Sequence, residues 1–325
     1  MSIQCEPSGF TRLTTSTGIS MVVSTFGARL VELWVPDREG VLGNVVVGLP
    51  TPQHYADRAN LYLGCTVGRV AGRIPGAHFT GGGLSFSLEP NEGPNQLHGG
   101  GTRSFDRIEW ELVTFESDES VIAEFHYVSP AGEEEYPGEL SVVSRYELTA
   151  LGVLTCTLTA ETTSACPVNL TMHSYWNLSG VAGSTIHDHT LAADVAWHVE
   201  TGEGQLPTGE LTPAETGMSL AAPGWDDTFV LAEKDHTSSP AATLRHSASG
   251  RALTLYTTEP ALQVYTAGYL PEEAFDDVHV LTPFGGVCLE PQRMNDNALL
   301  PQFPSIVLQP GDTYSHVTQH VFSSI

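Results

Sequence analysis

The chain is dominated by short runs in which apolar and polar side chains alternate, separated by turns rich in glycine and proline. The run from Leu154 to Ala160 alternates along its whole length. Alternation with a period of two places successive side chains on opposite faces of a strand, so it predicts many short strands joined by turns. Similar β-rich runs occur at residues 20–25, 29–35, 121–127, 141–148, 253–258, 306–308 and 316–322.

Helical periodicity is scarce. Residues 52–60 and 271–275 could each form a short helix, and neither is long enough to cover a sheet. Strands without crossover helices favour antiparallel pairing. The expected fold class is therefore all-β, a large antiparallel β-sandwich with few short helices. No composition break marks a linker, so we expect a single domain over residues 1–325, with residues 201–224 as a surface excursion.

The composition argues against some classes of binding partner. The formal charge is −25, with 13 Lys and Arg against 38 Asp and Glu, and Lys234 is the only lysine. This acidity argues against a nucleic-acid partner and against an anionic membrane surface. There is no apolar run of the roughly 18 residues that a membrane helix needs, and no secretory signal is visible. The five cysteines include no C-x-x-C pair, so we expect reduced, mostly buried thiols in a cytoplasmic protein.

Two segments combine histidine with unusual neighbours. In residues 91–100, His98 precedes Gly99 and Gly100, where backbone can approach a ligand closely. The alternative is a plain turn histidine. In residues 169–178, alternation predicts a strand that presents His173 and Tyr175 on one face, together with Thr171 and Asn177. Such a face suits a polar ligand of the size of a sugar, and the alternative is a solvated polar face.

A third segment, residues 285–292, places Glu290 after a short apolar strand. A structural acid at a strand end is the plainer interpretation. His98, His173 and Glu290 are far apart in the sequence, so only the fold could gather them. Together they would supply a general acid, a general base and a polar orienting group. They would equally supply the ligands of a 2-His-1-carboxylate metal site, and the composition does not distinguish the two.

Taken together, these segments resemble the aldose 1-epimerase (galactose mutarotase) family, in the family's order and over nearly the whole chain. Residues 68–74 are similar to its early arginine motif, 95–100 to N-x-L-H-G-G and 173–178 to H-S-Y-F-N-L. The resemblance continues through P-T-G at 207–209, D-H-x-F-x-L at 226–231, Q-x-Y-T at 263–266, L-E-x-Q at 289–292 and the closing strand pair at 308–322.

The resemblance implies the fold and the roles of individual residues. The family's fold is a large antiparallel β-sandwich. His173 matches its general acid, Glu290 its general base, and His98 a second active-site histidine that holds the sugar. Positions that contact sugar hydroxyls are matched by Arg73, Tyr175, Asp226 and Gln263. Neither a cofactor nor a metal is implied.

Three positions depart from the family pattern. Gly72 and Met172 stand where the family commonly has asparagine, before the motif arginine and before the motif histidine, and Asp227 stands where histidine is frequent. The first could remove a sugar contact, and the second could alter the packing behind His173.

The implied activity is an isomerase reaction that interconverts the α and β anomers of free aldoses such as galactose and glucose. Glu290 would take the C1 hydroxyl proton while His173, kept protonated by nearby carboxylates, protonates the ring oxygen. The alternatives are a hexose-6-phosphate 1-epimerase, which needs extra cations such as Arg103, Arg107 or Arg293, a non-catalytic carbohydrate-binding protein, and a metal-dependent enzyme.

Overall fold

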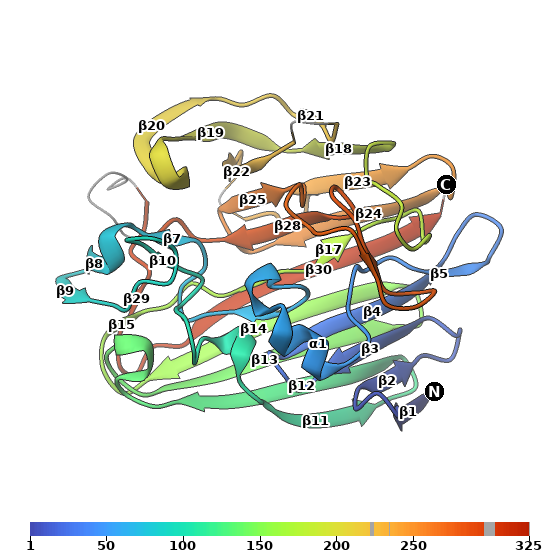
Figure 1. The fold of residues 1–325 in the computed structure, drawn as a ribbon, viewed down its shortest axis with the longest axis horizontal. Coiled ribbons are helices and arrows are strands. Elements are labelled where there is room, and N and C mark those ends of the chain that lie inside the picture. Colours follow the sequence, from blue (N-terminus) through green and yellow to red (C-terminus); the bar gives the residue numbers. More distant parts are fainter. Residues whose placement is uncertain (222–223, 234, 296–302, 325) are drawn as a thin grey trace.

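The structure, a computed structural model, describes residues 1–221, 224–233, 235–295 and 303–324. Figure 1 shows three large sheets, and the long strands of the largest one run along the long axis of the molecule. All pairs of named strands in these residues are antiparallel, so the antiparallel β-sandwich predicted from the sequence is confirmed. The bounds of the strands are given sheet by sheet below.

The five-stranded sheet contains β1 (Ser2–Cys5), β2 (Thr11–Thr14), β3 (Ser20–Ser24), β4 (Arg29–Pro36) and β5 (Leu42–Asn44). The nine-stranded sheet contains, in spatial order, β11 (Glu111–Glu116), β12 (Ser120–Ser129), β13 (Leu140–Thr149), β14 (Val153–Thr162), β30 (Tyr314–Ser324), β24 (Arg251–Thr257), β23 (Ala242–His246), β18 (His189–Ala193) and β21 (Gly217–Ser219). The six-stranded sheet contains β17 (Tyr175–Trp176), β28 (Val287–Gln292), β25 (Ala261–Tyr265), β22 (Asp226–Leu231), β19 (Val195–Thr201) and β20 (Pro207–Pro213).

Short ribbons complete the β-structure. They pair β6 (Thr66–Val67) with β16 (Thr171–Met172), β7 (Arg73–Ile74) with β10 (Gln96–Leu97), β8 (His78–Gly81) with β9 (Leu84–Ser87), β15 (Cys166–Pro167) with β29 (Val307–Leu308), and β26 (Glu273–Ala274) with β27 (Val280–Leu281). The strands predicted from alternation are all present.

The main apolar core lies between the sheets and takes side chains from all three of them, for example Leu33, Leu158 and Leu289. In the six-stranded sheet, alternation divides the two faces. Leu262 and Leu289 belong to this core, whereas their neighbours Gln263 and Glu290 line a cleft on the other face. The sheet therefore presents a polar face that the core does not use.

One predicted helix forms and the other does not. Helix α1 (Pro52–Asp57) begins after Thr51, whose side chain accepts a hydrogen bond from the His54 amide, and a 3₁₀ turn, η1 (Ala59–Leu61), follows it. The predicted helix at 271–275 is wrong, because Glu273 lies in β26, which pairs with β27, and its carboxylate binds Arg58. The other 3₁₀ turns are η2 (Pro75–Ala77), η3 (Phe105–Arg107), η4 (Glu133–Glu135) and η5 (Glu203–Gln205).

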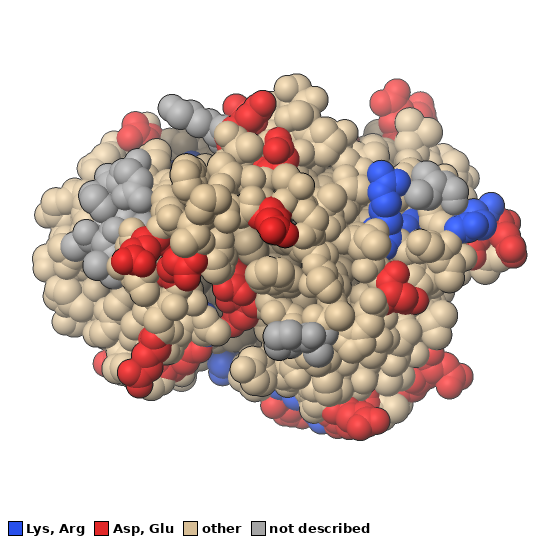
Figure 2. All heavy atoms as spheres, turned by 90° about the horizontal axis from the view of Figure 1, so that it is seen from above, with Lys and Arg blue, Asp and Glu red and all other residues tan. Residues whose placement is uncertain are grey.

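The thiols and the surface fit the sequence analysis. All five cysteines are free, and all but Cys5 are buried. Acidic side chains are spread over the face seen in Figure 2, whereas basic ones gather in fewer places on it. No helix in the described ranges is long and apolar enough to cross a membrane.

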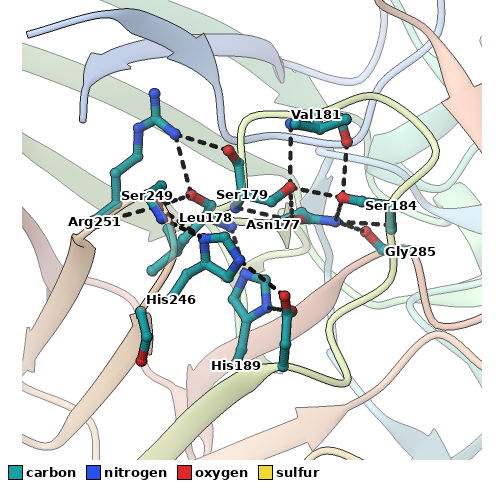
Figure 3. A network of polar contacts seen from close by, with 12 residues as sticks. Asn177, Leu178, Ser179, Val181, Ser184, His189, His246, Ser249, Arg251 and Gly285 are labelled. Atoms are coloured by element: carbon teal, nitrogen blue, oxygen red, sulfur yellow. Dashed lines mark hydrogen bonds and ion pairs between the residues drawn. The ribbon is translucent and has the colours of Figure 1, made fainter. Parts of the chain in front are cut away.

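A buried arginine fixes the turn that follows β17. Arg251 is 3% exposed, and its guanidinium donates to the carbonyl oxygens of Leu178 at 3.3 Å and Ser179 at 2.9 Å (Figure 3). It also donates to Val35 O at 3.2 Å and Val41 O at 3.0 Å, in the region of β4 and β5. One cation therefore ties the chain leaving β17 to the five-stranded sheet.

A histidine pair supports the same turn from below in Figure 3. The Leu178 amide donates to His189 Nε2 at 2.9 Å, so the neutral His189 ring carries its proton on Nδ1. Asp188 accepts from His189 Nδ1 at 3.0 Å and from His246 Nε2 at 3.0 Å. Nε2 of His189 already accepts from the backbone and is not available to a ligand. We therefore interpret Asp188, His189 and His246 as a structural network.

The burial of His189 should make its contribution to stability depend on pH. Desolvation lowers the pKa of His189 to about 4, against 6.5 in an unfolded chain. The native state therefore holds the ring neutral, and its contribution is complete above pH 6.5 and is lost as the pH falls toward 4. That difference corresponds to roughly 3 kcal/mol at most.

We expect the stability advantage of the wild type over a His189→Gln variant to shrink by this order between pH 7 and pH 4. Urea unfolding of both proteins at several pH values measures it. A difference that stays constant with pH would contradict the assignment of a buried neutral ring.

Candidate functional site

A cleft of about 480 Å³ opens on the polar face of the six-stranded sheet. All seven residues singled out from the sequence line it, namely Arg73, His98, His173, Tyr175, Asp226, Gln263 and Glu290. They come from β7, β17, β22, β25, β28 and the segments beside them. Folding therefore gathers residues that are up to 217 positions apart (290 − 73) around one cavity.

The strand register places the chemistry-bearing side chains next to one another. Glu290 on β28 lies directly opposite Gln263 on β25, and Cys288 lies between Tyr175 and Tyr265 on its two neighbouring strands. Directly opposed residues have Cβ atoms about 5 Å apart. Since alternate residues share a face, this register brings these strand side chains to one surface.

The segment 169–178 is more buried than the sequence suggested. It forms two short strands with different partners, because β16 pairs with β6 whereas β17 pairs with β28. His173 lies between them and exchanges backbone hydrogen bonds with Gly64 and Cys65, each at 2.9 Å. The predicted common face holds for His173 and Tyr175, which both line the cleft, and not for Thr171 and Asn177, whose side chains donate instead to backbone carbonyls. The solvated alternative is wrong, because the whole segment is buried.

His98 is held as a neutral donor. Its backbone lies in the left-handed region, with φ at 53°, and its amide donates to Gly72 O at 3.0 Å. The Gly72 amide donates back to His98 Nδ1 at 3.2 Å, so the ring proton lies on Nε2. Burial, together with the nearby His173, lowers the pKa of His98 well below its usual value. The ring is therefore uncharged and can donate into the cleft.

Glu290 and His173 face each other across the floor of the cleft. Glu290 Oε1 lies 3.7 Å from His173 Nε2, and the two side chains are 3% and 5% exposed. Burial raises the pKa of Glu290 far above its usual value, and the charge of Asp226 adds to this. Burial also lowers the pKa of His173 to about 4. The expectation that nearby carboxylates keep the free His173 protonated is therefore wrong, because burial disfavours the imidazolium and Arg29 adds to this.

The two pKa shifts together indicate where a proton shared by Glu290 and His173 lies. Both shifts favour the uncharged forms, so a proton that the pair shares is favoured on Glu290 over His173 when the cleft holds no sugar. Moving that proton to His173 gives a carboxylate beside an imidazolium with no change in net charge. The pair therefore always offers one proton donor and one proton acceptor.

The 2-His-1-carboxylate alternative does not fit this geometry. Near the cleft, the one group of potential ligand atoms in the described residues that converges within 4.8 Å is His173, Cys288 and Glu290, without His98. Cys288 Sγ lies 3.5 Å from His173 Nδ1, on the opposite edge of the ring from Glu290. Burial raises the pKa of Cys288 well above 9, which keeps it a thiol and a poor metal ligand.

The remaining polar groups are fixed before a ligand arrives. Gln263 Nε2 donates to Asp226 Oδ1 at 2.8 Å, and the Thr228 hydroxyl donates to Gln263 Oε1. Arg73 forms a bidentate ion pair with Glu92, with Nε–Oε2 at 2.7 Å and Nη2–Oε1 at 2.8 Å. These bonds orient an amide, a carboxylate and a guanidinium, which are the planar groups that recognise vicinal hydroxyls.

Comparison with known proteins identifies the family of this chain. The family model described as aldose 1-epimerase matches residues 10–320. The chain belongs to the aldose 1-epimerase family. It is 38% identical to galactose mutarotase from Mus musculus, over 95% of this chain and 92% of the relative, and 29% identical to aldose 1-epimerase from Escherichia coli, over 98% and 96%. A solved aldose epimerase homologue from C. elegans superposes with a TM-score of 0.85 at 26% identity, covering 98% of this chain and 99% of that one.

The structure explains two of the three departures of this aldose 1-epimerase from the family pattern and describes the surroundings of the third. Gly72 has φ at 75°, a left-handed conformation that glycine and asparagine adopt most readily. Met172 packs in the main core, so its side chain is part of the apolar support behind the site. Asp227 Oδ1 lies 2.9 Å from His198 Nε2, so β19 places an imidazole beside the acid.

Sequence reasoning missed several lining residues of this aldose 1-epimerase. The cleft wall also contains Tyr62, Glu92, Tyr265 and Tyr269. Tyr265 lies two residues beyond Gln263 on the same strand, so alternation could have found it. Tyr62 follows a 3₁₀ turn and carries no motif, and no sequence signal pointed to it.

Proposed function

We propose that this chain interconverts the α and β anomers of a free aldose, with Glu290 and His173 moving the two protons that ring opening requires. The observation that carries the proposal is the buried Glu290–His173 pair, separated by 3.7 Å on the floor of a polar cleft. An isomerase of the aldose 1-epimerase family needs one proton acceptor and one proton donor at the same pH, and this pair supplies both.

The reaction requires no redox step and no covalent bond to the protein. Glu290, as the carboxylate, takes the proton of the C1 hydroxyl while His173, as the imidazolium, protonates the ring oxygen O5. The C1–O5 bond breaks to give the open-chain aldehyde. Rotation about C1–C2 presents the other face of the carbonyl, and reclosure returns both protons. Glu290 and His173 end in their starting states.

Binding of a sugar would supply the hydrogen bond that the Glu290 carboxylate lacks. In the part of the chain that the structure describes, no hydrogen bond to the Glu290 carboxylate is present, although it is 2% exposed. A hydroxyl at C1 would donate to this carboxylate and favour its charged form. The proton then resides on His173, next to O5. The substrate thus shifts the shared proton to the productive side.

Four further side chains are proposed to hold the sugar. His98 offers an Nε2–H donor, and the fixed groups of Arg73, Asp226 and Gln263 offer donors and acceptors for hydroxyls. Tyr175 remains a predicted contact, although its hydroxyl already donates to Leu61 O at 2.7 Å. Because these groups are oriented by protein contacts, little side-chain entropy is lost on binding.

The charge around the cleft disfavours a phosphorylated sugar. The described lining contains two arginines, and both face a carboxylate, since Arg73 pairs with Glu92 and Arg293 Nε lies 3.4 Å from Glu259. Arg103 and Arg107 are not among the lining residues and pair with Glu133 and Asp106. A phosphate would therefore meet no unpaired cation.

We expect fast anomer exchange with free aldoses, galactose among them as the names of the relatives suggest, and at least about tenfold lower kcat/KM with a hexose 6-phosphate. Polarimetry on freshly dissolved single anomers, or exchange NMR for rapid cases, measures both. Preference for the phosphorylated sugar would favour the hexose-6-phosphate alternative. Binding without exchange would favour a carbohydrate-binding protein.

A further inference from the structure

The His173 ring stacks with two tyrosine rings. The Tyr175 ring centroid lies 5.1 Å from that of His173, with the planes 25° apart. Tyr62 also stacks on His173, at 5.9 Å and 24°. The edges of the same imidazole are taken by Cys288 Sγ at Nδ1 and Glu290 at Nε2. The ring is therefore stacked with two aromatic rings, and its two nitrogens lie beside the polar groups of β28.

Tyr62 is held in this place at some conformational cost. Its φ is 51°, in the left-handed region that a bulky residue rarely adopts. Its carbonyl accepts from the Cys65 thiol at 3.2 Å, and its amide donates to Ala59 O at 3.1 Å. The ring also packs edge-on against His98 at 4.7 Å. A strained residue that is held so firmly beside a reactive group suggests a functional constraint.

Aromatic faces act on the two protonation states of an imidazole differently. The face of a tyrosine ring carries negative potential, and a cation within about 6 Å of its centroid is attracted to it. The neutral ring gains only packing. The protonated form is the one that burial disfavours here, so the two tyrosines oppose the cost of desolvating the imidazolium.

We infer that Tyr62 and Tyr175 are positioning residues that clamp the His173 ring and favour its protonated form, an inference that rests on the proposed role of His173 as proton donor. Other titratable or charged groups also act on this ring. Glu290 attracts the imidazolium and Arg29 disfavours it, whereas the His98 ring and the buried thiols of Cys65 and Cys288 are uncharged neighbours. None of these is changed by a substitution at Tyr62.

Tyr62 is the better residue to substitute, because its hydroxyl makes no hydrogen bond to the described part of the chain. Within the described ranges no hydrogen bond involves that hydroxyl, so Tyr62→Phe keeps the aromatic face and removes no bond. Tyr62→Leu removes the face. Tyr175 is less suitable, since Tyr175→Phe would also remove the bond to Leu61 O.

The first arm of the test is kinetic. We expect Tyr62→Leu to lower kcat by on the order of tenfold, with Tyr62→Phe retaining clearly more activity than Tyr62→Leu. The loss should fall on kcat more than on KM. Phe115→Leu on the exposed edge strand β11 is the matched control and should leave kcat unchanged. Equal kcat values for the Tyr62→Leu and Tyr62→Phe variants would overturn the inference.

The second arm does not depend on activity. In a Glu290→Gln background, the His173 ring signals are followed by NMR over the pH range in which circular dichroism shows a folded protein. Tyr62→Leu should move the titration to lower pH by about one unit, and Tyr62→Phe should move it less. Superimposable curves for the two variants would refute the clamp even if the enzyme were active. If the wild type failed to exchange anomers, this arm would still decide the question.

Discussion

Replacing Glu290 with glutamine is expected to reduce anomer exchange by about 10²–10⁴-fold, the usual contribution of a positioned proton-transfer group. Glutamine keeps the shape of the side chain and cannot take up the C1 hydroxyl proton. Burial and Asp226 raise the pKa of Glu290 far above its usual value, so the folded protein favours the uncharged carboxyl. An uncharged amide in its place should therefore leave the fold intact.

The measurement for Glu290→Gln is the rate of change in optical rotation after a pure anomer is dissolved, corrected for the uncatalysed rate. Glu147→Gln is the matched control, because this glutamate lies on β13 of the nine-stranded sheet and pairs with Arg145. It should keep the wild-type rate. A Glu290→Gln enzyme that retains the wild-type rate would show that the base has been assigned to the wrong residue.

Replacing His173 with asparagine should cause a loss of similar size. Asparagine can donate a hydrogen bond toward O5 but cannot deliver a proton, so the ring-opening step loses its acid. His126→Asn on β12 is the control, since that imidazole is partly exposed, pairs with Glu124 and does not line the cleft. The same polarimetric assay applies, with near-ultraviolet circular dichroism as the check on packing.

The double variant provides a sharper test of the pair. If Glu290 and His173 act as one unit that shares a proton, the double variant should be about as slow as the slower single variant, because neither residue works without the other. Multiplicative losses would mean that the two residues act independently. That result would contradict the shared-proton mechanism while leaving each residue important.

The sequence predicted the fold because alternation is a local property. The run from Leu154 to Ala160 lies in β14, and each of its side chains takes the face that a period of two requires. His173 and Tyr175 share the cleft as alternation predicted, although His173 lies in the break between β16 and β17 and not in a continuous strand. The helix predicted at 271–275 failed for the opposite reason. Its local pattern was overridden by strand pairing and by the ion pair between Glu273 and Arg58, which is 215 residues away in the sequence.

The sequence could predict which residues line the site but not their protonation states. Motifs identified seven residues that line one cleft, and their roles remain predictions. The protonation of His173 was misjudged, because a pKa depends on how completely the ring is desolvated, and burial is a property of the assembled fold. Tyr62 was missed because its place beside His173 follows from one left-handed residue after a 3₁₀ turn, which leaves no pattern in the sequence.

The layout of the six-stranded sheet separates the residues proposed for proton transfer from other cleft residues that could set sugar selectivity. The proposed proton-transfer pair and its neighbours are positioned by β28 and by β17 and β25, the strands that hydrogen-bond to β28 on either side. Thr201, Gln205 and Pro207 come instead from the outlying β19–β20 hairpin, and Tyr269 from the segment after β25. Libraries directed at a new sugar should therefore vary these outlying residues and leave β17, β28 and β25 unchanged, so that sugar selectivity can change while turnover is retained.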